Sequence, residues 1–186
     1  MKKIVALLLC LALTLGCAAM AETAEKEYQE LTIVGKFTAK WITPQGYSVI
    51  DVQSGDDGHM IAAFVPDEEN AGKPMMIVSI APDELLWEVK RLNDLDDAAL
   101  AQIEATFREE DEVDISYMET AYGTKLMVIK ETKDSVDYVD FYTIYLGYEI
   151  ELVLTQTEEM AGTSITDEQI ATVIQFLSDL VFEPAE

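Results

Sequence analysis

Residues 136–155 read VDYVDFYTIYLGYEIELVLT and contain the clearest strand–turn–strand pattern in the chain. The segments Val136–Tyr145 and Tyr148–Thr155 are rich in aromatic and branched side chains, and Leu146-Gly147 between them predicts a tight hairpin turn. In the second segment apolar residues alternate with Glu149 and Glu151, so we expect the glutamates to face water. The residues expected to face the core are Tyr148, Ile150, Leu152 and Leu154.

Strand-like segments also lie on both sides of this hairpin. They cover residues 31–42, 47–52, 60–65, 75–80, 113–118, 126–129 and 181–182. Short connections between most of them favour antiparallel neighbours. Residues 75–80 are apolar throughout, which predicts a strand covered on both faces. Residues 126–129 are also apolar on both sides, which predicts a central strand.

Two helices are expected between and after the strands. Leu95, Ala99, Ile103 and Phe107 recur every four residues and predict an amphipathic helix over 95–107, with Asn93 or Asp94 as its N-cap. The second helix opens with Thr166-Asp167-Glu168-Gln169, a capping-box sequence. The order of elements predicts an α+β fold in one domain. Its twisted antiparallel sheet would carry these two main helices in a sandwich-like arrangement.

Three features together resemble the layout of PsbP-like exported bacterial proteins. Gly123-Thr124-Lys125-Leu126 enters a strand, a long hairpin passes through Gly147-Tyr148, and the Thr-capped helix leads to Val181-Phe182. The resemblance spans residues 31–183 and is one of layout, with no diagnostic motif. It implies a sheet sandwiched by helices and an accessory role rather than an enzymatic one, and it transfers no functional residue to this chain.

The chain begins like an exported bacterial protein. A basic start precedes an apolar stretch over residues 4–16, which is too short for a bilayer-spanning helix. Ala19 and Ala21 stand at the positions that signal peptidase reads, so we expect cleavage before Glu22. The predicted organisation is therefore a signal peptide over 1–21, a flexible arm over 22–30, a globular domain over 31–183 and a tail over 184–186.

A second interpretation of the leader stays open. Residues 13–17 read LTLGC and resemble a lipoprotein cleavage signal, although a leucine is expected where Thr14 stands. Cys17 would then be lipidated, and the protein would be a cell-envelope lipoprotein. No later segment predicts a transmembrane span, so membrane attachment is expected only through Cys17.

Charge and cysteine content limit the possible partners. The chain holds 36 acidic and 12 basic residues, a net charge of −24. Such a field repels nucleic acids and anionic lipids and attracts cationic ligands or basic proteins. Both cysteines, Cys10 and Cys17, lie in the leader, so the secreted form is expected to be free of disulfides and of cysteine catalysis.

The usual signatures of catalysis and of metal binding do not occur. His59 is the single histidine, which predicts neither a histidine-rich metal site nor a catalytic triad. The acidic loops at 56–58 and 93–97 do not follow calcium-loop spacing, and residues 109–112 suit a solvated helix end. We therefore expect no catalytic, metal or cofactor-binding residues and no cofactor.

These observations favour a non-catalytic extracytoplasmic accessory or binding protein that takes a protein partner or a cationic ligand. Tyr138 and Tyr142 fall on one side of their strand with Asp140 between them, and form a candidate partner face. Packing of these tyrosines beneath a helix is the alternative. A carboxylate-based hydrolase is another alternative function. It would place two acids in one cavity, one of them with a raised pKa.

Overall fold

The computed structural model describes residues 28–33, 37–55, 58–108, 113–133, 135–157, 160 and 162–184. The predicted signal peptide, its cleavage residues Ala19, Ala21 and Glu22, and Cys17 lie outside these residues. The strands are β1 (Gln29–Ile33), β2 (Phe37–Trp41), β3 (Tyr47–Ser54), β4 (Met60–Pro66), β5 (Met75–Pro82), β6 (Asp114–Glu119), β7 (Lys125–Lys133), β8 (Val136–Tyr145), β9 (Tyr148–Thr155) and β10 (Val181–Pro184). The helices are α2 (Asp97–Arg108) and α3 (Asp167–Asp179), with 3₁₀ turns η1 (Glu68–Asn70), η2 (Glu84–Leu86) and η3 (Leu92–Asp94).

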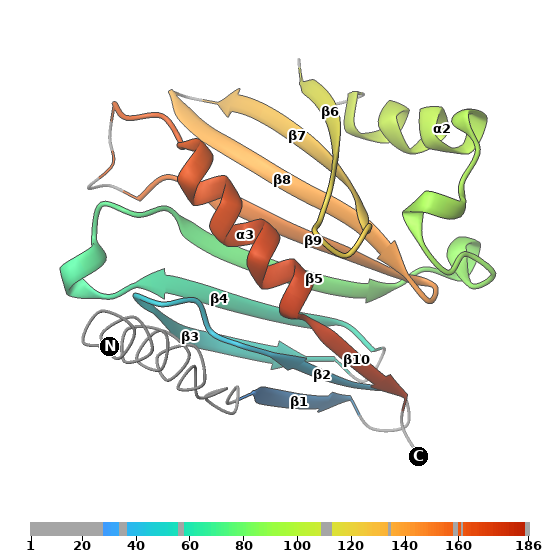
Figure 1. Ribbon diagram of the computed structural model, residues 1–186, viewed down its shortest axis with the longest axis horizontal. Coiled ribbons are helices and arrows are strands. Elements are labelled where there is room, and N and C mark those ends of the chain that lie inside the picture. The colour runs from blue at the N-terminus through green and yellow to red at the C-terminus, as the bar shows by residue number, and fades with distance from the viewer. Residues whose placement is uncertain are drawn as a thin grey trace, which may run out of the picture.

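The named strands form two antiparallel sheets (Figure 1). The larger sheet has seven strands in the order β3-β4-β5-β9-β8-β7-β6, and the smaller has three in the order β1-β2-β10. The expected α+β class with antiparallel strands is confirmed at this level. The expectation of one sheet is wrong, because the first predicted strand and the last pair with each other instead of joining the larger sheet.

The smaller sheet arises from a break in the first predicted strand. Residues 31–42 were expected to form one strand, but they divide between β1 and β2, which pair antiparallel. Gly35 stands between the two strands in the sequence. Gln29 and Glu30, expected in the flexible arm, belong to β1, and β10 reaches Pro184 of the expected tail.

The main core lies between the larger sheet and a layer made of α3 and the smaller sheet. Figure 1 shows α3 running across the larger sheet before the chain enters β10. Phe64 of β4 meets Phe176 of α3 edge to face, with ring centroids 5.0 Å apart. Phe37 of β2 meets Tyr148 of β9 at 4.6 Å. These aromatic contacts join α3 and the smaller sheet to the larger sheet in one core.

The opposite face of the larger sheet is covered at one end only. Leu100 of α2 and Leu92 of η3 pack on Met127, Ile129 and Ile144 of β7 and β8, forming a second core. The helix begins later than expected: Asp96, rather than Asn93 or Asp94, caps it by accepting a hydrogen bond from the Ala99 amide at 2.9 Å. The predicted sandwich is therefore incomplete, because α2 packs at the β6–β8 end of the sheet.

Two local predictions are confirmed. Leu146 and Gly147 both have positive φ angles, 51° and 80°, and join β8 to β9 in a two-residue hairpin turn. Thr166 and Gln169 form both hydrogen bonds of the capping box that opens α3. Among the described residues, the helices are too short or too polar to cross a membrane.

Candidate functional site

The outward face of β4 and β5 is only partly covered. Along β5, Met76, Val78 and Ile80 are buried, whereas Ile77 and Ser79 between them are half-buried. This alternation corrects the prediction of a strand covered on both faces. We call the side of β3, β4, β5 and β9 turned away from α3 the open face. On β4 this face carries Ile61, whose side chain is 46% exposed.

Three carboxylates form a diagonal line at the edge of the open face. The hairpin register sets Tyr142 opposite Glu151 and Asp140 opposite Val153. On the other side of β8, Tyr138 lies opposite Glu131 of β7. Because directly opposed residues share a face of a sheet, Glu131, Asp140 and Glu151 are diagonal neighbours on the same face. We call these three residues the acidic row.

The acidic row is held in an unfavourable electrostatic state. Burial, and then the charges of Glu151 and Glu131, raise the pKa of Asp140 to about 7. Burial, followed by the charge of Glu149, also raises the pKa of Glu151. The expectation that Glu149 and Glu151 face water is therefore only half right, since both side chains are half-buried.

Two oxygens of the acidic row lack hydrogen-bond partners. Asp140 Oδ1 and Glu131 Oε1 are buried and accept no hydrogen bond from the described residues. The Nζ atom of Lys133 lies 3.9 Å from Glu131 Oε1, a long contact with a largely exposed lysine. A buried carboxylate oxygen without a donor costs free energy in the isolated protein. A positive charge bound beside the acidic row would favour its charged carboxylates electrostatically, without touching the buried oxygens.

The candidate partner face of Tyr138 and Tyr142 is largely covered in the structure. Tyr138, Asp140 and Tyr142 do share one side of β8, but Tyr142 is only 4% exposed. Its ring packs edge to face on Phe107 of α2, with centroids 5.5 Å apart. Tyr138 is half-buried. Packing beneath a helix, the alternative interpretation, is therefore correct for Tyr142.

The other candidate functional residues among the described residues do not lie together in one site. His59 is exposed directly before β4. The described part of the chain contains no group of three or more histidine, cysteine, aspartate or glutamate side chains that could hold a metal ion. Two cavities each have two carboxylates, Asp83 with Glu149 and Glu168 with Asp179. Neither cavity is lined by Asp140 or Glu151, the carboxylates with raised pKa.

Comparison with known proteins gives no relative from which to transfer a function: no protein-family model matches the chain, and no curated protein sequence does.

The sequence contained a usable signal for the acidic row. A two-residue turn at Leu146-Gly147 fixes the pairing of β8 with β9, and this register brings Asp140 and Glu151 together. A tight turn at Ser135 likewise fixes the pairing of β7 with β8, and this register brings Glu131 beside Asp140. The partial coverage of the sheet has no such local signal, because it depends on where α2 packs.

Proposed function

We propose that this protein is a non-catalytic extracytoplasmic binding protein whose open face binds a positively charged segment of a partner protein. The observation that carries the proposal is the acidic row, with Asp140 Oδ1 buried and unpartnered. Export is inferred from the leader over residues 1–21. Lipidation of Cys17 would place the same face beside a membrane.

Charge and apolar surface support one kind of partner. Lysine or arginine side chains would supply the positive charge that Asp140 and Glu151 lack, and the charge of −24 would speed their approach. The same face also carries apolar side chains, which would contact apolar residues lying between the basic residues of the partner segment. These side chains are Ile61, Ile77 and Val153. A segment in which basic and apolar residues alternate fits both features.

An accessory role is also what the layout resemblance to PsbP-like exported proteins implies. In that layout α2 and α3 would be the helices that sandwich the larger sheet. The open face would be the part of the sandwich left uncovered for a partner. Binding of a cationic segment to the open face does not require this layout.

The test uses a synthetic peptide of alternating lysine and isoleucine, with fluorescence anisotropy as the readout. The variant Asp140→Asn/Glu151→Gln keeps the size of both side chains and removes two carboxylates. Binding is measured at pH 8, above the pKa of about 7 of Asp140, so that both groups are charged in the unmodified protein. We expect it to weaken binding by at least about tenfold, because truncating one side of a partly desolvated charge pair is costly. A peptide with glutamate in place of lysine should not bind.

The matched control is Glu68→Gln/Glu69→Gln, which removes two exposed charges in η1 and so changes the net charge equally. Its affinity for the lysine peptide should stay within about twofold of the unmodified protein, since exposed charges contribute little to affinity. Equal weakening by the two double variants would mean that net charge alone attracts the peptide, and would refute the open face as the site.

A further inference from the structure

A cavity of about 390 Å³ lies beside the acidic row, between the sheet and the segment that contains η2 and α2. Its volume falls within the range of small-molecule sites in proteins. The walls are mainly apolar and come from η2, the chain after it, and α2. They include Leu86, Val89, Ile103 and Phe107. We call this space the η2–α2 cavity.

Two carboxylates also line the η2–α2 cavity. Glu149 of β9 lies opposite Ala81 of β5, and Asp83 follows two residues later along the same chain. The Asp83 amide donates to Gly147 O at 3.1 Å, which holds this segment against the β8–β9 turn. The described residues that line the cavity include no lysine, arginine or histidine. The cavity therefore combines apolar walls with two negative charges.

The Glu149 carboxylate is held in place by Tyr142. The Tyr142 hydroxyl donates to Glu149 Oε1 at 2.7 Å. Burial, and then this hydrogen bond, raise the pKa of Tyr142, so the hydroxyl remains a donor at physiological pH. Phe107 packs on the Tyr142 ring from the α2 side. A carboxylate fixed from one side in this way can present its charge to a ligand without a large ordering cost.

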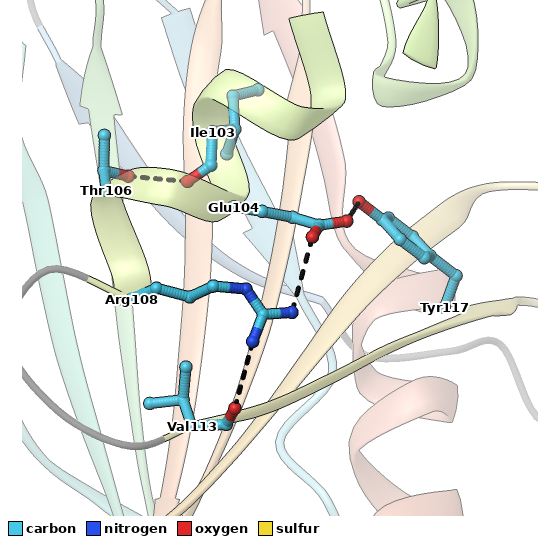
Figure 2. Close-up of polar contacts among 6 residues, drawn as sticks. All are labelled: Ile103, Glu104, Thr106, Arg108, Val113 and Tyr117. Atoms are coloured by element: carbon cyan, nitrogen blue, oxygen red, sulfur yellow. Dashed lines mark hydrogen bonds and ion pairs between the residues drawn. The ribbon is translucent and has the colours of Figure 1, made fainter. Parts of the chain in front are cut away.

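The α2 wall is fastened to the edge strand β6. Figure 2 shows Tyr117 of β6 pointing its hydroxyl at Glu104 of α2, while Arg108 reaches toward Glu104 and the main chain at Val113. The Tyr117 hydroxyl donates to Glu104 at 2.8 Å, and Arg108 donates to Val113 O at 3.3 Å. These contacts lie on the side of the helix away from the cavity. They fix the position of Ile103 and Phe107 as its wall.

One apolar side chain stands at the opening of the cavity. Leu85 of η2 lines the cavity, yet 90% of its surface is exposed. A leucine in this position loses water contact only when something apolar enters beside it. A ligand with an apolar body would bury Leu85 together with the cavity walls.

We propose that the η2–α2 cavity binds a small organic cation, an amine carried on an apolar body, with its ammonium group at Glu149 and Asp83. Charge complementarity selects the cation over a neutral or anionic molecule of the same shape. A hydrated metal ion is a poorer fit, because its water shell gains nothing from the apolar walls that make up most of the cavity. The site is separate from the acidic row and does not depend on the function proposed above.

The test is a titration of the protein with 2-phenylethylammonium, followed through backbone amide shifts in NMR spectra. We expect saturable shifts in η2, α2 and β9. The neutral analogue 2-phenylethanol has the same apolar body and should bind at least about fivefold more weakly, and 3-phenylpropionate should not bind. This comparison uses the unmodified protein, so it does not depend on the folding of any variant.

Two variants locate the site. Glu149→Gln keeps an oxygen to accept the Tyr142 hydrogen bond and should weaken 2-phenylethylammonium at least about fivefold. Ala99→Phe fills the cavity from α2 and should abolish saturable binding without changing charge. The matched control Glu88→Gln removes an exposed charge on the same segment and should bind as the unmodified protein does. Equal affinity for the amine and the alcohol, or unchanged affinity in Glu149→Gln or Ala99→Phe, would overturn the proposal.

Discussion

At the scale of single residues, Asp140 is a carboxyl group whose charged form is strongly disfavoured in the folded protein. Its pKa rises from an ordinary 3.8 to about 7 because burial and the neighbouring Glu151 and Glu131 disfavour the charged form. Between these two pH values the folded protein holds a proton on Asp140 that the unfolded chain has released. Stability contributed by this residue is therefore present at low pH and is lost as pH rises toward about 7.

Asp140→Asn removes this titration while keeping the side chain's shape. We expect the variant to be more stable than the unmodified protein at pH 8 by about 2–4 kcal/mol, and nearly equal to it at pH 4. Urea unfolding at the two pH values measures the difference. Asp114→Asn, at an exposed position on the edge strand β6, serves as control and should change stability little at either pH. Equal stability of Asp140→Asn and unmodified protein at pH 8 would contradict the assigned role of Asp140.

At the scale of elements, the β8–β9 hairpin carries a correctable local strain. Leu146 takes a φ of 51° in its turn, a conformation that costs a residue with a β-carbon about 1 kcal/mol and that asparagine tolerates better. Its side chain is 48% exposed, so replacing it removes little packing. We expect Leu146→Asn to raise the free energy of unfolding by about 0.5–1 kcal/mol in urea denaturation.

The control for this substitution is Leu85→Asn in η2, which removes a still more exposed leucine from a helical turn. It should leave stability unchanged or lower it slightly. A gain of similar size in both variants would point to the removal of an exposed leucine as the cause, and would exclude relief of strain in the turn.

The elements that the sequence predicted correctly are those with local signals. Leu146-Gly147 specifies its own turn, and Thr166 with Gln169 specifies the start of α3. The division of residues 31–42 into β1 and β2 was missed, since Gly35 is a weak signal inside a segment rich in strand-forming residues. The start of α2 was missed because three neighbouring polar residues could each cap it, and only the structure shows that Asp96 does.

At the scale of the whole molecule, the η2–α2 cavity and the exposure of the open face depend on contacts that no local pattern specifies. Register alone could have placed Asp140 beside Glu151. The η2–α2 cavity could not have been predicted, because it requires α2 to pack on Tyr142 and the chain after β5 to meet the turn at Gly147. The same packing leaves β4 and β5 partly uncovered. The η2–α2 cavity and the uncovered part of the open face therefore both depend on the packing of α2 at the β6–β8 end of the sheet.

The net charge of −24 also makes a prediction for the whole molecule. Like charges destabilise the compact state, and salt screens that repulsion. The ion pairs that salt would weaken are at least partly exposed, such as Lys40 with Glu183 and Arg108 with Glu104, and contribute little. Raising sodium chloride from about 0.02 M to about 0.5 M at pH 7 should therefore raise the melting temperature by about 3 °C, roughly 1 kcal/mol for a domain of this size.

The same measurement near pH 4.1, where the net charge is zero, separates repulsion from other effects of salt. There the rise in melting temperature should vanish, because no excess of negative charge remains to be screened. A rise of equal size at both pH values would instead assign the effect to strengthened burial of apolar surface. A fall at pH 7 would mean that specific charge pairs outweigh the repulsion, which would remove the electrostatic reason for expecting a cationic partner.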